Sequence, residues 1–275
     1  MILPSWVIPG SAVLFCAACA LVQSPSEYAR TLAESAGFMP VEVADSRLRA
    51  FAKRSAPGAG NSRVTVYVES DGAPWRFPDD PPSDPTPLIP LVLRMAITDP
   101  SPAVAYLGRP CQYLREADLI KCDPELWMRG RFSNEAVAAM DLAVDQIKRI
   151  SGAAEVNLVG YSGGGAMAAL IAARRSDVSC LVTLAAPLDT NAWTDTMRVS
   201  RLDLSLNPAD VADMLRYVRQ THFRGARDKL VPPATSKRFL ERVTGATVVN
   251  KEKFDHQCCW REEWNELRRS SCLAQ

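Results

Sequence analysis

One pentapeptide constrains the fold of this chain more than any other feature. Gly160-Tyr161-Ser162-Gly163-Gly164 follows the apolar run Val156–Val159 and precedes an alanine-rich segment, Ala166–Arg174. The pattern predicts a buried strand, a very tight turn, and a helix whose N-terminus faces that turn. The glycines lack the Cβ atoms that would clash, so we expect Ser162 to stand exposed on a strained turn. The pentapeptide alone arises often by chance, and its flanking elements make it informative.

Short apolar strands alternate with helical segments along the rest of the chain. We expect strands at Leu48–Lys53, Val64–Glu69, Val104–Leu107, Cys180–Leu184, Thr221–Gly225 and Ala246–Val249. We expect helices at Tyr28–Ala36, Leu88–Ile97, Asn134–Ile150 and Ser236–Val243. Such alternation requires crossover connections, and it predicts an α/β fold with a mostly parallel central sheet flanked by helices on both faces. The functional loops of such a sheet gather at the carboxyl ends of its strands.

Size and charge narrow the class of protein. The chain has 275 residues, 47% of them hydrophobic and 23% charged, which fits one α/β domain over residues 21–275. The net charge of +1 and the scattered Lys and Arg residues argue against a nucleic-acid partner. The proline-rich acidic stretch Pro74–Pro90 is expected to be an ordered surface loop, and a linker between domains is the alternative.

The N-terminal segment reads as an export signal. Residues 2–22 are uncharged and largely apolar but broken by two prolines, which is untypical of a spanning helix. Residues 1–20 are therefore expected to be a signal peptide, although Lys and Arg are missing from its first part. Cys16-Ala17-Ala18-Cys19 resembles a bacterial lipobox, in which Cys19 would carry the lipid and anchor the protein to a membrane. Cleavage after Ala20 by an ordinary signal peptidase is the alternative. In both cases we expect an exported bacterial protein, either periplasmic or anchored to a membrane by its lipid.

The cysteine content is consistent with export. Cys111 and Cys122 close a short loop, and we expect a disulfide between them. One of the adjacent Cys258 and Cys259 is expected to bond Cys272. Cys180 lies in a buried-strand pattern and is expected to be a free core thiol. None of the cysteines has the spacing to histidine that zinc requires, so no metal site is expected.

An exposed serine needs a base to take its proton, and only two histidines compete for that role. His222 lies inside the expected strand Thr221–Gly225, where a structural role is favoured. His256 follows the last expected strand and precedes a helix, so its side chain can reach over the sheet edge toward Ser162. We expect His256 to be the base.

The base in turn needs a carboxylate that orients its ring. Asp228 directly follows a strand and lies between Ser162 and His256 in the chain. Asp255 is the rival, but the side chains of neighbouring residues usually point apart. Asp228 is the favoured acid, which gives the chain order Ser, Asp, His.

The negative charge that develops on the substrate oxygen needs two N–H donors, together called the oxyanion hole. One donor is expected to be the amide of Gly163, at the N-terminus of the helix after the serine. The second is expected from the turn that follows the strand at Val64–Glu69. Pro74 has no N–H, which leaves Ala73 as the favoured donor and Gly72 as the alternative.

Together these residues resemble the α/β-hydrolase superfamily, and more narrowly a group of exported or lipoprotein α/β hydrolases of bacteria. The narrower resemblance covers nearly the whole chain from about residue 28. It is carried by seven segments, which are Tyr67–Gly72 with Trp75, Asp84–Pro87, Arg109–Tyr113, Trp127–Ser133, Gly160–Gly165, Ser205–Asp210, and Asp255-His256 with Cys258. Asp71-Gly72 departs from the superfamily's usual His-Gly, and the segment between Pro187 and Arg219 is too short for a large lid. The resemblance implies a serine hydrolase with a small cap or none.

The expected function is cleavage of a carboxylic ester through an acyl-enzyme. The expected partner is a small-molecule or lipid-like ester, with no cofactor and a monomeric protein. An amidase or peptidase that uses the same three residues is an alternative, and a surface-anchored binding protein without turnover is another.

Overall fold

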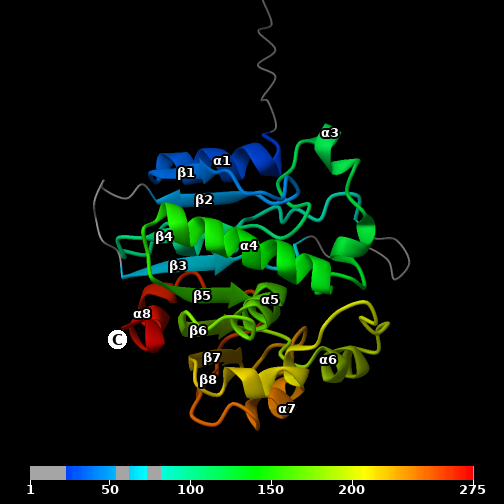
Figure 1. Cartoon of the computed structure of the whole chain (residues 1–275). Helices are drawn as coiled ribbons and strands as arrows, with labels where there is room; N and C mark the ends of the chain where they lie inside the picture. The colour runs from blue at the N-terminus through cyan, green and yellow to red at the C-terminus, as the bar shows by residue number, and fades with distance from the viewer. Residues whose placement is uncertain (1–22, 54–61, 73–81, 275) are drawn as a thin grey trace, which may run out of the picture.

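The computed structural model describes residues 23–53, 62–72 and 82–274, whose eight strands form one sheet (Figure 1). The strands are β1 Phe38–Val41, β2 Ala50–Lys53, β3 Arg63–Val68, β4 Val104–Leu107, β5 Glu155–Tyr161, β6 Val178–Leu184, β7 Arg219–Gly225 and β8 Thr247–Lys251. The α-helices are α1 Pro25–Ser35, α2 Leu91–Ala96, α3 Glu116–Leu119, α4 Asn134–Ile150, α5 Gly163–Ala172, α6 Thr190–Met197, α7 Lys237–Leu240 and α8 Trp264–Arg269. Five short 3-10 helices complete this part of the chain, η1 Pro124–Trp127, η2 Pro208–Asp210, η3 Ala212–Leu215, η4 Pro233–Ser236 and η5 Cys272–Ala274.

The sheet runs in the order β1-β2-β4-β3-β5-β6-β7-β8. From β4 to β8 every neighbouring pair is parallel, whereas β1 pairs antiparallel with β2 and β2 pairs antiparallel with β4. The predicted mostly parallel sheet is therefore confirmed. Strand β1 was not anticipated, because it is only four residues long and contains Pro40. A proline is tolerated in a strand at the edge of a sheet.

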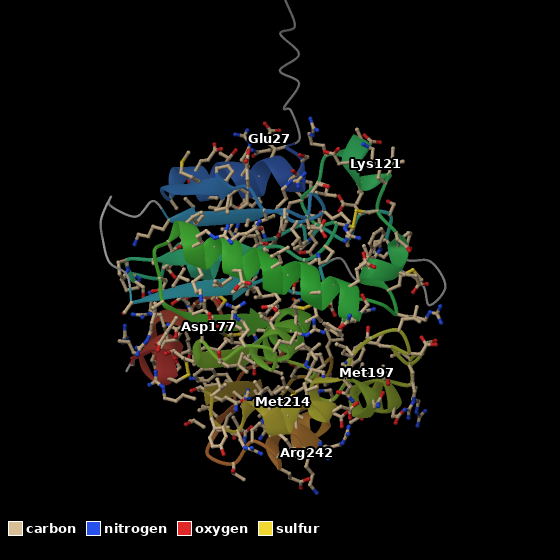
Figure 2. The ribbon with its side chains drawn as sticks, in the orientation of Figure 1. Glu27, Lys121, Asp177, Met197, Met214 and Arg242 are labelled. Atoms are coloured by element: carbon tan, nitrogen blue, oxygen red, sulfur yellow. A yellow bond between two sulfur atoms is a disulfide. The ribbon has the colours of Figure 1, made fainter. Side chains whose placement is uncertain are left out.

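Helices cover both faces of the sheet, as the alternation of strands and helices predicts. Helices α4, α5 and α7 pack on one face, and α4 and α5 lie in front of the sheet in Figure 1. Helices α1, α2 and α8 pack on the other face. Charged side chains such as Glu27, Lys121 and Arg242 lie at the periphery of this assembly (Figure 2).

The elements on either side of Ser162 are deeply buried. All ten residues of α5 are buried, and β5 is buried from Val156 onward. Helix α5 consists mainly of glycine and alanine in its first seven positions, so its backbone approaches the sheet closely. The turn between β5 and α5 is therefore held from both sides by the packed core.

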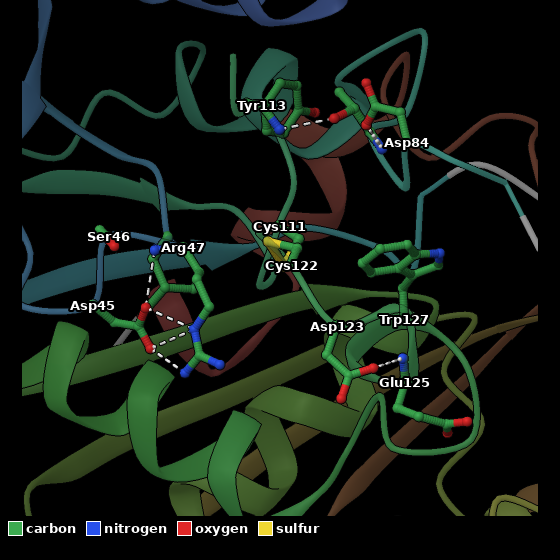
Figure 3. Close-up of a disulfide and its surroundings, with 12 residues drawn as sticks. Asp45, Ser46, Arg47, Asp84, Cys111, Tyr113, Cys122, Asp123, Glu125 and Trp127 are labelled. Carbon is green, nitrogen blue, oxygen red and sulfur yellow. Dashed lines mark hydrogen bonds and ion pairs between the residues drawn. A yellow bond between two sulfur atoms is a disulfide. The ribbon is translucent and has the colours of Figure 1, made fainter. Parts of the chain in front are cut away.

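The disulfide between Cys111 and Cys122 is present, and their Cα atoms are 6.1 Å apart (Figure 3). It joins the segment after β4 to the segment after α3, so both ends of this loop are tied near the carboxyl edge of the sheet.

The other predicted cysteine pairing is wrong. Cys272 bonds Cys180 of β6, so the expectation of a free thiol at Cys180 is wrong as well, and Cys258 bonds its neighbour Cys259. The physical reason is that α8 packs against the sheet and brings the following residues back to the strands, where Cys272 donates its N–H to Thr221. The two bonded cysteines are 92 residues apart, so their proximity depends on the folded sheet.

We expect the loss of the Cys180–Cys272 bond to destabilise the protein more than the loss of the Cys111–Cys122 bond. The first bond closes a loop of 92 residues and the second a loop of 11. The loss of chain entropy in the unfolded state therefore predicts that their contributions to the free energy of unfolding differ by about 2 kcal/mol. All four cysteines are buried, so the paired Cys→Ala variants are matched for cavity formation. Urea unfolding of both double variants measures the difference, and equal losses would contradict it.

Some sequence predictions fall outside the described residues. These are the signal segment 1–20 with Cys19, the possible cleavage after Ala20, Ala73, and the first half of the proline-rich loop. Within the described ranges, the helices are all too short or too polar to cross a membrane.

Candidate active site

Ser162 occupies the turn between β5 and α5 in a backbone conformation that side chains rarely adopt. Its φ is +53°, and its N–H donates to the carbonyl of Leu184 on the neighbouring strand at 2.8 Å. The turn is so tight that a Cβ on Gly160 would lie 2.2 Å from the carbonyl oxygen of Gly164. Only glycine fits that position, and the resulting turn is the strained strand-to-helix elbow that the pentapeptide predicts.

The three residues selected from the sequence meet at the carboxyl edge of the sheet. Nε2 of His256 lies 3.1 Å from Oγ of Ser162, and Nδ1 of His256 lies 2.8 Å from Oδ2 of Asp228. Asp228 follows β7 and His256 follows β8, so parallel strands deliver all three side chains to one edge. These distances allow a proton to pass from the serine to the histidine.

Asp228 uses its two carboxylate oxygens for different tasks. Oδ1 accepts the N–H groups of Leu230 and Val231 at 2.9 and 2.8 Å, while Oδ2 faces His256. The side chain is completely buried. The first oxygen therefore fixes the loop after β7, which in turn fixes the oxygen that orients the histidine.

Asp255 is turned away from the histidine ring. Its Oδ1 accepts the N–H groups of Gln257 and Cys258, both at 2.8 Å, and the residue is exposed. These two backbone hydrogen bonds lower the pKa of Asp255 below its ordinary value. Asp255 thus shapes the loop that carries His256 without touching the imidazole nitrogens.

The backbone of His256 is held by two aromatic side chains. Its carbonyl oxygen accepts the Tyr161 hydroxyl at 2.6 Å and the Trp260 Nε1–H at 3.0 Å. Tyr161 directly precedes Ser162, so the residue before the serine positions the histidine. Burial raises the pKa of Tyr161, and the hydroxyl remains a donor.

His222 has the structural environment that its place inside β7 predicts. Its ring lies 2.8 Å from the Thr183 hydroxyl and 3.1 Å from the Gln220 side-chain oxygen. Burial, with a smaller effect from the charge of Arg224, lowers the pKa of His222 to about 3. It therefore stays neutral and fully engaged in the sheet.

The expected oxyanion donors are only partly within the described residues. Gly163 is the first residue of α5, whose N-terminus faces the site, and Ala73 lies outside the described ranges. Gly72 is described and adopts a φ of +88°. The loop just before it is held by Gln112, whose Nε2 donates to the carbonyl of Ser70 at 3.0 Å.

Sequence reasoning missed a partly buried ion cluster beside the elbow. Asp71 pairs with Arg109 at 2.9 Å and with Arg131 at 3.1 Å. The available signal was the replacement of the usual His-Gly by Asp71-Gly72, together with an arginine in the segment Arg109–Tyr113.

A second carboxyl group, Glu69, is buried at the end of β3. It accepts hydrogen bonds from the N–H of Ser70 at 2.8 Å, the Tyr106 hydroxyl at 3.0 Å and the Tyr113 hydroxyl at 3.4 Å. Burial raises the pKa of Glu69 to about 7 and outweighs these three donors, which act in the opposite direction. Glu69 therefore changes charge near neutral pH.

The raised pKa predicts that Glu69 weakens the fold as the pH rises. Its ordinary pKa is 4.5, so the folded protein holds the proton more tightly than the unfolded chain, and this stabilisation is lost between about pH 4.5 and 7. Glu69→Gln imitates the neutral form and does not lose this stabilisation. When the pH is raised from 5 to 8, its free energy of unfolding should therefore rise relative to that of wild type by up to about 3 kcal/mol. Urea unfolding at both pH values measures this. The exposed Glu116→Gln is the control, and a Glu69→Gln variant that keeps the wild-type pH dependence would contradict the prediction.

Metal chemistry was not expected from the sequence. Within the described ranges there is no group of three or more His, Cys, Asp or Glu side chains placed to hold a metal ion.

Comparison with known proteins gives a family match and a set of shared architectures. Residues 119–208, about a third of the chain, match the family model described as alpha/beta hydrolase fold. Curated proteins yield no sequence match. Est1E from Butyrivibrio proteoclasticus is 13% identical with a TM-score of 0.61, covering 87% of this chain and 100% of its own.

Two larger enzymes share the same architecture. A puromycin hydrolase is 19% identical with a TM-score of 0.57, covering 84% of this chain and 37% of its own. The Pyrococcus horikoshii acylaminoacyl peptidase is 11% identical with a TM-score of 0.58, covering 80% of this chain and 37% of its own. The present chain thus spans little more than a third of either protein. At these identities the likeness concerns the fold. The family match, the strand order and the elbow together show that the chain has the α/β-hydrolase fold.

Proposed function

We propose that the protein is a serine hydrolase that cleaves carboxylic esters through an acyl-enzyme. The observation that carries the proposal is the continuous hydrogen-bonded chain from Asp228 through His256 to Ser162, which stands on the strained elbow. A serine hydroxyl attacks a carbonyl carbon only when a base takes its proton, and this geometry supplies that base.

The proposed reaction follows from the roles of these three groups. Oγ of Ser162 bonds to the carbonyl carbon while its proton moves to Nε2 of His256, and the carbonyl oxygen becomes an oxyanion. The amide of Gly163, with Ala73 or Gly72, donates to that oxygen. The C–O bond then breaks, and the alcohol leaves with the proton from His256. A water molecule, deprotonated by His256, repeats the attack on the acyl-enzyme and releases the acid.

An amidase or peptidase is the second candidate. It is favoured by the likeness in fold to a puromycin hydrolase and an acylaminoacyl peptidase. Both activities pass through the same tetrahedral intermediate, and they differ in how strongly the leaving group must be protonated. The whole chain of Est1E matches the present chain, so Est1E is closer to it in size than the two larger proteins are.

A matched pair of substrate series tests the proposal. The rates of hydrolysis of p-nitrophenyl esters with acyl chains of two to twelve carbons are compared with those of p-nitroanilides of the same acyl groups. Labelling by a fluorophosphonate probe is measured separately by mass spectrometry. We expect one probe per chain on Ser162 and ester turnover far above anilide turnover. Preferential anilide turnover would make the protein an amidase. A folded protein that neither labels nor turns over would be a binding protein.

We also propose that the protein is exported and acts as a monomer. The uncharged apolar segment at residues 2–22 and the three disulfides within the described residues support export to an oxidising compartment. Mass spectrometry of the mature N-terminus distinguishes a lipidated Cys19 from cleavage after Ala20. Size-exclusion chromatography with light scattering tests the oligomeric state.

A further inference from the structure

A carboxylate lies directly against the nucleophile elbow. A Cβ on Gly163 would lie 2.0 Å from Oδ1 and 2.4 Å from Oδ2 of Asp71, so the carboxylate packs on the Cα of the residue after Ser162. Any side chain at position 163 would collide with it. Because Gly163 opens α5, the carboxylate also meets the positive end of the helix dipole.

Each oxygen of this carboxylate has its own guanidinium. Arg109 binds Oδ1 at 2.9 Å from the segment after β4, and Arg131 binds Oδ2 at 3.1 Å from the segment before α4. Arg109 is buried, stacks over the ring of Phe132 at 4.9 Å, and donates to the carbonyl of Arg131. Three loops that are distant in the sequence are thereby joined at Asp71.

The two arginines also decide the charge beside the oxyanion site. A lone carboxylate next to the amide of Gly163 would repel a developing oxyanion, whereas one carboxylate with two guanidiniums carries a net charge of +1. Burial alone would raise the pKa of Asp71, but the charges of Arg131 and Arg109 outweigh it and hold the pKa below its ordinary value. Asp71 thus stays ionised and paired.

Asp71 belongs to the short loop that leads to the expected oxyanion donors. Gln112 holds this loop from the other side, because its Nε2 donates to the carbonyl of Ser70 while its oxygen accepts the N–H of Arg109. The side chain of Asp71 and the backbone of Ser70 are therefore both fixed by residues of the segment Arg109–Gln112.

We propose that Asp71 is a positioning residue that clamps the loop Ser70–Gly72, which leads to the expected oxyanion donors, onto the elbow, and that Arg109 and Arg131 are required to pair its two carboxylate oxygens. The inference rests on the proposed function, because an oxyanion forms only if Ser162 attacks a carbonyl. Asp71 occupies the place of the superfamily's usual histidine but acts through the loop and the arginines.

The test uses Asp71→Asn, Arg131→Gln and the double variant in steady-state ester hydrolysis. Asp71→Asn should lower kcat about 10-fold with KM within 2-fold, because the clamp serves the transition state more than substrate binding. Arg131→Gln removes the partner of Oδ2, lowers the net charge of the cluster from +1 to 0, and should lower kcat about 100-fold. The double variant should return to the level of Asp71→Asn, since the carboxylate with one unpaired oxygen is then gone. Additive losses in the double variant would overturn the proposal.

Two further variants separate charge from folding. Arg131→Lys keeps the positive charge and should retain at least half of wild-type kcat, and a loss equal to that of Arg131→Gln would overturn the role of charge. Arg129→Gln is the matched control, because Arg129 is two residues away and pairs on the surface with Glu125 and Asp203. It should behave as wild type.

The wild-type protein keeps this inference distinct from the proposed function. If wild type neither labels with the fluorophosphonate nor turns over esters, the proposed function itself fails. If wild type is active and both Asp71→Asn and Arg131→Gln keep wild-type kcat, only the clamp is overturned.

Discussion

Replacement of Ser162 by alanine is expected to abolish fluorophosphonate labelling and to lower ester turnover about 10⁶-fold. The variant keeps His256 and Asp228 but has no oxygen to form the acyl bond. Because the serine side chain makes no capping hydrogen bond to α5, the fold should survive the change. Turnover of p-nitrophenyl esters and urea unfolding of the same preparation measure the two effects.

The strain at position 162 supplies a second readout of the same site. A non-glycine residue at φ +53° costs of the order of 1–3 kcal/mol, which glycine does not incur. Ser162→Gly should therefore be inactive yet melt at a higher temperature than Ser162→Ala. Residual labelling of either variant would place the nucleophile elsewhere, and a lower melting temperature for the glycine variant would contradict the strain.

Asp228→Asn is expected to lower ester turnover about 10⁴-fold, as the corresponding change does in other serine triads. The amide retains an oxygen that can accept from Leu230 and Val231 and so keep the loop in place. Its NH₂ group would then face Nδ1 of His256, where it favours the wrong tautomer of the ring. The loss should appear in kcat, measured with one ester from pH 5 to 9.

Asp255→Asn is the matched control for this change. Its carboxylate accepts only backbone N–H groups from Gln257 and Cys258, and an amide oxygen serves that purpose nearly as well. We expect turnover within 2-fold of wild type. A large loss in Asp255→Asn together with a small loss in Asp228→Asn would reverse the assignment of the acid.

Much of this site was predictable because its signals are local. Ser162 is marked by a strand, a glycine-rich turn and a helix within about twenty residues. His256 and Asp228 were selected because each follows a strand, and parallel strands end at the same edge of a sheet. His222, inside a strand, was set aside by the same rule, and its buried bonds to Thr183 and Gln220 agree with that choice.

Other features depend on contacts between segments far apart in the chain. The Cys180–Cys272 bond spans 92 residues. Nearness in the sequence predicted Cys258 or Cys259 as the partner of Cys272 instead. The pairing of Asp71 with Arg109 and Arg131 likewise requires three loops to meet. No periodicity or turn signal encodes such meetings, because they depend on the order of the strands and on the packing of side chains.

The sequence by itself determined the alternation of strands and helices, the strained turn at Ser162 and the chain order of the three site residues. These follow from backbone sterics and hydrophobic periodicity, which act over a few residues. The tertiary structure alone decided the separation of 3.1 Å between Ser162 and His256, the identity of the disulfide partners, and the neutralised carboxylate against Gly163. Those depend on which surfaces pack together, and packing is a property of the whole sheet and its helices.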